Sequence, residues 1–86
     1  MKISARHKRT LETVFADPVP ATIEWNEVTA LMRALGARIK EREGSRVVFI
    51  INKSKLIIHR PHPRKELGKG AVESLKIFLR NNELTP

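Results

Sequence analysis

The stretch from residue 37 to residue 59 reads ARIKEREGSRVVFIINKSKLIIH. It holds a loosely alternating segment, a middle segment that is β-branched almost throughout and a short apolar one. These are separated by Gly44-Ser45 and by Asn52-Lys53-Ser54, both of which are typical turn sequences. The middle segment is apolar almost throughout, as expected of a central strand. We therefore expect an antiparallel meander of three strands, over residues 37–43, 46–52 and 55–59.

Alternation along these strands predicts which side chains share a face, because successive residues of a strand point to opposite sides of the sheet. In the third strand, Leu56 and Ile58 share one face, and Ile57 and His59 share the other. The outward face of the first strand would carry three cations, Arg38, Lys40 and Arg42. We expect this face to be open to solvent and His59 to lie near Arg46 across it.

Amphipathic segments lie on both sides of the meander. Apolar residues at i, i+3, i+4 and i+7 predict a helix from Trp25 to Leu35, and Gly36 suits the position after a helix where φ turns positive. A second helix is expected from Lys69 to Asn81, and Trp25 and the three phenylalanines are interpreted as core. Helices packed on one face of the sheet would give a two-layer α+β fold, in the order α-β-β-β-α.

An additional N-terminal helix is predicted, capped by Ser4 and running to about Ala16, where Asp17-Pro18 ends it. We interpret this helix as an appendage on a proline-stiffened linker. The expected division is an N-terminal helix and linker, a domain and a tail, over residues 1–22, 23–82 and 83–86.

The charge of the chain is strongly positive, +8 over 86 residues. Six cations against Glu66 give +5 between residues 53 and 70, and a second basic group comprises Lys2, Arg6, Lys8 and Arg9. Such clustering favours a polyanionic partner, either nucleic acid or an acidic protein surface.

The composition also excludes several classes of protein. The absence of cysteine rules out disulfides and thiolate metal sites. No apolar run approaches the roughly 18 residues of a membrane span, and the N-terminus lacks the apolar region of a secretory signal. We expect a cytoplasmic protein.

The link between the last strand and the last helix reads HRPHPRKELGKG over residues 59–70. The link contains His62-Pro63, Glu66-Leu67 and Gly70 in that order. With these residues, the helix Trp25 to Gly36 and the Gly44-Ser45 turn, the chain resembles the HicA-like toxins of bacterial toxin–antitoxin pairs. The resemblance implies the fold of double-stranded-RNA-binding domains. It also implies an mRNA interferase that cleaves without a metal or other cofactor, and a HicB-like antitoxin that covers it.

One position departs from that family. Active members place a histidine directly after the Gly-Ser turn, whereas this chain has Arg46 and then Val47. A guanidinium stays charged and cannot act as a general base, although it can bind a phosphate and stabilise a pentacovalent transition state. The catalytic histidine of the family therefore cannot be carried over.

Histidine suits the proton transfers of metal-free RNA cleavage. His59 is the first candidate for a relocated acid or base, and His62 the second, with a role in tying the link to the sheet as its alternative. His7 is interpreted as part of a helix stripe. A metal site at His59 and His62 is not expected, because Pro61 disrupts the spacing and no third ligand is adjacent.

Two main functions remain open. The first is an RNA-binding protein and candidate metal-independent endoribonuclease, whose expected phosphate contacts are Arg46, Arg60, Arg64 and Lys65. The second is a non-catalytic RNA- or partner-binding module that kept the fold and lost the reaction. A weaker third possibility is DNA binding by the basic first helix. No small-molecule cofactor and no membrane contact is expected.

Overall fold

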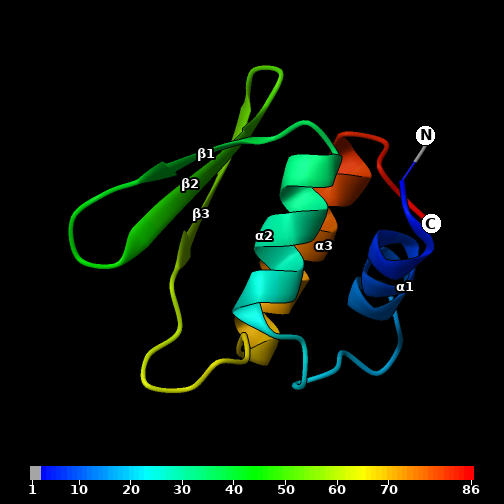
Figure 1. Ribbon diagram of the computed structural model, residues 1–86, viewed down its shortest axis with the longest axis horizontal. Helices are drawn as coiled ribbons and strands as arrows, with labels where there is room; N and C mark the ends of the chain where they lie inside the picture. Colours follow the sequence, from blue (N-terminus) through cyan, green and yellow to red (C-terminus); the bar gives the residue numbers. More distant parts are fainter. Residues whose placement is uncertain (1–2) are drawn as a thin grey trace.

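The computed structural model describes residues 3–86 and contains three helices and one three-stranded sheet (Figure 1). The elements follow in the order α1 (Ala5–Val14), α2 (Trp25–Ala34), β1 (Arg38–Glu41), β2 (Arg46–Ile51), β3 (Ser54–His59) and α3 (Lys69–Asn81). The expected α+β class and element order are confirmed. The differences are at the ends. The elements α1, α2, β1 and β2 stop one or two residues earlier than the sequence pattern suggested, β1 starts one residue later, and β3 starts one residue earlier.

The sheet is antiparallel throughout, with β2 in the centre. Val47, Phe49 and Ile51 of β2 are all buried and alternate with Arg46, Val48 and Ile50. This alternation fixes the register, because a shift by one residue would turn the whole apolar set to the other face. The helices α2 and α3 cover the face that carries Phe49, and the other face is open (Figure 1).

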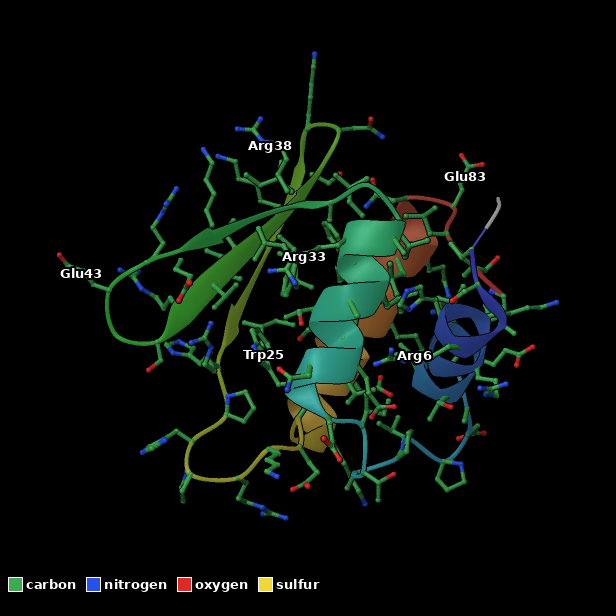
Figure 2. All side chains as sticks on the ribbon, in the orientation of Figure 1. Arg6, Trp25, Arg33, Arg38, Glu43 and Glu83 are labelled. Carbon is green, nitrogen blue, oxygen red and sulfur yellow. The ribbon has the colours of Figure 1, made fainter. Side chains whose placement is uncertain are left out.

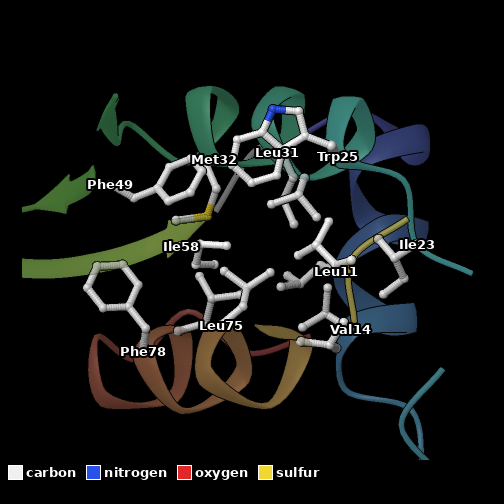
Figure 3. Packing of buried hydrophobic residues seen from close by; sticks show 14 of the residues in the cluster. Leu11, Val14, Ile23, Trp25, Leu31, Met32, Phe49, Ile58, Leu75 and Phe78 are labelled. Atoms are coloured by element: carbon white, nitrogen blue, oxygen red, sulfur yellow. The ribbon is translucent and has the colours of Figure 1, made fainter. Parts of the chain in front are cut away.

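The core lies between the sheet and the helices (Figure 3). Phe49 is fully buried, and its ring centroid lies 5.8 Å from that of Trp25 at the start of α2. Phe78 of α3 is also buried, and Phe15 is partly buried beneath the guanidinium of Arg80. The expectation that the aromatic residues form core is thus confirmed for the buried three and holds in part for Phe15.

The first helix is not a loose appendage. Leu11 and Val14 are fully buried in the same cluster as Leu31 of α2 and Leu75 of α3 (Figure 3). The helix contacts α2 and α3, which lie between it and the sheet (Figure 1). The helix was expected as an appendage, whereas its apolar side packs into the domain core.

Caps and turns explain where the elements begin and end. The Ser4 hydroxyl accepts a hydrogen bond from the His7 amide, 3.3 Å away, and so caps α1 as expected. Glu24 and Glu27 form a reciprocal capping box at α2, which the sequence analysis missed. Gly36 has φ of 89°, as predicted for the residue that ends α2, and Gly44-Ser45 turns with φ of 69° and 66°.

Within residues 3–86, no helix combines the length and the apolar composition needed to cross a bilayer.

Candidate nucleic-acid interface

The open face of the sheet is cationic at its sides and apolar in its centre. The register sets Arg38 beside Ile50 and Lys55, and Lys40 beside Val48 and Ile57. A third row contains Arg42, Arg46 and His59. The Arg42 amide donates a hydrogen bond to the Arg46 carbonyl at 2.7 Å, and Arg46 is the cross-strand partner of His59. None of these nine positions is acidic, so the face presents a uniformly positive field to an anionic ligand.

The exposure of these side chains matches their place on the open face. Arg38 is exposed and projects from the sheet away from the helices (Figure 2). Val48 is nevertheless only 6% exposed, because longer neighbours such as Lys40 and Ile57 flank it. The prediction that Arg38, Lys40 and Arg42 would line an open face is confirmed.

Arg46 and His59 are direct cross-strand partners at the end of the sheet nearest the Gly44-Ser45 turn. Both residues are exposed, and their side chains leave the same face because they occupy opposed positions of an antiparallel pair. The Nε of Arg46 donates to the carbonyl of Glu43 at 3.1 Å, which orients the guanidinium and leaves its terminal nitrogens available. The structure thus brings together the histidine and the arginine that were expected to meet here.

A hollow of about 270 Å³ adjoins His59. It lies between the free edge of β3 and the first half of α3, and its walls are Ile57, Ile58, His59, Gly70, Ala71 and Ser74. The small residues of α3 leave space beside the strand edge. The sequence carries a signal for it in the GKGAVES start of α3, which has no bulky side chain toward β3 before Val72.

Arg60 does not join Arg46 and His59. Its guanidinium lies 3.2 Å from the carboxylate of Glu41 and 5.9 Å from the centroid of the Trp25 ring, on the side of the sheet that faces the helices. This direction follows from alternation, since Arg60 is the residue after His59 and its amide still pairs with the Ser45 carbonyl, at 2.8 Å. One of the four expected phosphate contacts is therefore already engaged.

The remaining candidates lie on the link between β3 and α3. His62, Arg64 and Lys65 are all exposed. The imidazole of His62 forms no hydrogen bond with any residue in the described part of the chain, so the expected tie from this side chain to the sheet is not present.

The link is anchored at its other end instead. The Trp25 amide donates to the Lys65 carbonyl at 2.8 Å, and the Leu67 amide donates to the Ile23 carbonyl at 2.9 Å. These bonds form an antiparallel bridge centred on Glu24 and Glu66, and Leu67 is buried beneath it. The bridge explains why an exposed, proline-containing link has a defined course.

A metal ion has no evident place in this surface. Among residues 3–86, no three histidine or acidic side chains are grouped closely enough to hold one.

Helices on one side of a three-stranded antiparallel meander, in the order α-β-β-β-α, define a small α+β domain of the double-stranded-RNA-binding type. A family model described as the HicA toxin of bacterial toxin–antitoxin systems matches residues 25–82, and the chain belongs to this family. The match begins at α2 and leaves α1 outside it. Neither the curated proteins nor the solved structures contain a match.

Proposed function

We propose that this member of the HicA toxin family binds RNA on the open face of its sheet and cleaves it without a metal. The observation that carries the proposal is the direct pairing of Arg46 with His59 on a face without carboxylates. Where active members of the resembled family have a histidine after the Gly-Ser turn, this chain has an arginine. An imidazole on the adjacent strand, opposite that position, can supply the missing proton-transfer group.

In the proposed reaction, His59 takes the proton of a ribose 2′-hydroxyl, whose oxygen then attacks the adjacent phosphorus. The bond from phosphorus to the 5′-oxygen breaks, which leaves a 2′,3′-cyclic phosphate and a new 5′-hydroxyl. Arg46 donates hydrogen bonds to the non-bridging oxygens and stabilises the charge of the pentacovalent transition state. His62 is the second candidate for proton transfer, and its place on the exposed link would let it protonate the leaving oxygen.

The cations contribute unequally in this proposal. Arg46 contacts the scissile phosphate, while Arg64 and Lys65 hold the backbone that leaves the sheet along the link. Arg60 would have to leave Glu41 before it could contact a phosphate, so we expect a smaller contribution from it. The hollow beside β3 would receive a sugar or base next to the cleaved bond.

The proposed protein partner is a HicB-like antitoxin that covers the same face. Membership of the family implies a toxin–antitoxin partner, and the surface suggests its chemistry. Acidic side chains would neutralise Arg38, Lys40 and Arg46, and an apolar group would cover Ile57, which is 57% exposed.

The second candidate function is a binding module without catalysis. The replacement of the turn histidine by Arg46 favours it, because a guanidinium binds phosphate well and transfers no proton. This alternative shares the RNA surface and the partner with the first proposal. The two differ only in whether His59 or His62 performs chemistry.

The deciding experiment is an incubation of labelled single-stranded RNA with purified protein in EDTA. A His59→Ala/His62→Ala variant tests the proposed site, and His7→Ala is the matched control because His7 lies on α1. Cleavage by the wild type and His7→Ala, but not by the double variant, would support the ribonuclease.

Each single histidine variant then assigns the roles. Loss with His59→Ala alone would place proton transfer on the sheet, and loss with His62→Ala alone would move it to the link. Binding without cleavage by all proteins would favour the binding module. Equal cleavage by the wild type and the double variant would contradict the proposed site.

A further inference from the structure

We propose that a second site, in a hollow between α1 and the start of α2, binds a phosphate group. The hollow has a volume of about 330 Å³ and is lined by Arg6 and Arg9 of α1, three threonines, Ile23 and Glu27. This volume falls at the low end of small-ligand sites, which run from about 300 to 1,000 Å³. None of the lining residues comes from the sheet, and α1 lies on the side of α2 and α3 away from the sheet (Figure 1), so the site is distinct from the open face.

The two arginines are placed by helical spacing. Arg6, Arg9 and Thr13 follow one another at i, i+3 and i+7, beside the buried stripe of Leu11 and Val14. The hollow that this row borders is closed on the other side by Thr22 and Ile23, in the segment before α2. Figure 2 shows Arg6 projecting from α1 toward α2.

Neither arginine forms an ion pair with a carboxylate in residues 3–86. The one acidic side chain of the hollow, Glu27, already accepts a hydrogen bond from the Glu24 amide at 2.9 Å as part of the capping box. The guanidinium groups therefore keep most of their donors free. A phosphate oxygen is the acceptor that arginine pairs bind most strongly.

The threonines divide into two kinds. Thr10 and Thr13 donate their hydroxyl protons to the carbonyls of Arg6 and Arg9, at 3.2 and 2.8 Å, so they bond within α1. Thr22 makes no side-chain hydrogen bond within the described residues and has a hydroxyl proton to offer. The donor set for an anion is thus Arg6, Arg9 and Thr22.

The sequence of α1 contradicts the usual charge preference of a helix. Its first turn contains no acidic residue and includes Arg6, although the positive end of the helix dipole lies there and disfavours cations. Arg6 and Arg9 also repel one another at i, i+3. Locally unfavourable charges of this kind are expected at functional positions. A bound anion would offset both the unfavourable interaction with the helix dipole and the repulsion between the two arginines.

The site does not depend on the proposed ribonuclease, because α1 lies outside the family match and away from His59. The phosphate could belong to an RNA backbone or to a small solute, and the same three side chains would bind either one. A site of this kind would hold RNA that passes around the helices, or would link the protein to the supply of a phosphorylated metabolite.

The test uses the full chain with Arg6→Gln/Arg9→Gln, and Lys8→Gln/Arg33→Gln as the control with an equal loss of charge. Lys8 and Arg33 are exposed and do not line the hollow. Thermal unfolding and amide chemical shifts are followed with millimolar inorganic phosphate, and separately with a ten-nucleotide RNA that lacks terminal phosphates. Both readouts are needed because phosphate also stabilises proteins without a specific site.

We expect phosphate to raise the melting temperature of the wild type and the control alike, and to shift the Thr22 amide. The Arg6/Arg9 variant should bind phosphate at least about tenfold more weakly, since each lost charge-assisted hydrogen bond costs more than about 1.4 kcal/mol. In phosphate-free buffer the same variant should melt higher than the wild type, because the like-charge repulsion is gone.

A larger loss for the RNA than for inorganic phosphate would assign the site to a nucleic-acid backbone, and the reverse to a small phosphorylated ligand. Thr22→Val provides a variant that leaves α1 packing intact, and it should weaken binding to a lesser extent. Equal phosphate responses from all four proteins, or shifts confined to the sheet, would overturn the proposal.

Discussion

The two faces of the sheet are built from the same three strands and differ in almost every property. On the covered face, Val47, Phe49 and Ile51 pack against α2 and α3 and are nearly inaccessible to solvent. On the open face, cations flank Val48 and Ile50, and no carboxylate balances them. The covered face is explained by folding alone, whereas the open face has a pattern that folding does not require. This contrast is the reason we propose a ligand-binding role for the open face.

The largest expected effect in this comparison is the loss of stability caused by Phe49→Ala on the covered face. Phe49 is fully buried between the sheet and α2, so the truncation would leave a cavity and cost about 3–5 kcal/mol. Small domains have a total stability of about 5–15 kcal/mol, so the variant should be close to unfolding. Urea unfolding, followed by circular dichroism, measures the loss.

Ile57→Ala is the matched control, because Ile57 lies on the open face and is 57% exposed. It should cost less than about 1 kcal/mol. Comparable losses at the two positions would mean that the open face is covered in solution, by a second copy or by a partner.

The core behind the covered face also includes α1, and Leu11→Ala tests how much the packing of this helix contributes to stability. Leu11 is 1% exposed and packs with Leu31 and Leu75, so we expect a loss of about 2–5 kcal/mol in a single unfolding transition. The fluorescence of Trp25, in α2, reports whether the whole domain responds. The exposed neighbour Glu12→Ala should leave the transition in place. An unchanged Trp25 transition in Leu11→Ala would support the expected division in which residues 1–22 are a separate unit.

Much of this comparison could be predicted from the sequence, because it depends on local periodicity. The strands, their order and the side that Arg38, Lys40 and Arg42 occupy follow from alternation. The pairing of Arg46 with His59 follows from the one short turn between β2 and β3. The attachment of α1 could not be predicted in the same way. An amphipathic stripe shows that a helix buries one face, but it does not say against which element.

The contacts of the link between β3 and α3 also could not be predicted from the sequence. Glu41 and Arg60 meet although they are 19 residues apart, and the Lys65 carbonyl pairs with the amide of Trp25, which lies far earlier in the chain. Long-range contacts of this kind depend on where the whole link passes. Arg46 and Arg60 were therefore both expected to contact phosphate, while the structure places them on opposite sides of the sheet.

On the open face, Arg46→Gln is expected to weaken RNA binding without loss of stability. A phosphate contact on single-stranded RNA contributes about 0.7 to the slope of log affinity against log salt, so the slope should fall by that amount. The free energy of unfolding should change by less than about 0.5 kcal/mol. Filter binding or fluorescence anisotropy over a range of salt concentrations gives the slope.

Arg33→Gln removes the same charge from α2 and serves as control for the sheet site. It should leave the salt slope nearly unchanged, since Arg33 lies on the helix side of the sheet (Figure 2). Equal falls for Arg46→Gln and Arg33→Gln would show that RNA responds to net charge, and the contrast between the faces would then have no bearing on binding.

The smallest effect concerns the ion pair of Glu41 and Arg60 at the rim of the covered face. Its side chains are 71% and 48% exposed, so a double-mutant cycle with Glu41→Gln and Arg60→Gln should give a coupling of only about 0.2–1 kcal/mol. The effect of Glu41→Gln on RNA binding should have the opposite sign, because it releases Arg60 from its carboxylate and removes a negative charge near the sheet. We therefore expect a slightly less stable protein that binds RNA more tightly, with the gain lost again in the double variant. A gain that persists after Arg60 is also replaced would assign it to the general field of the surface and would leave Arg60 as a structural residue of the rim.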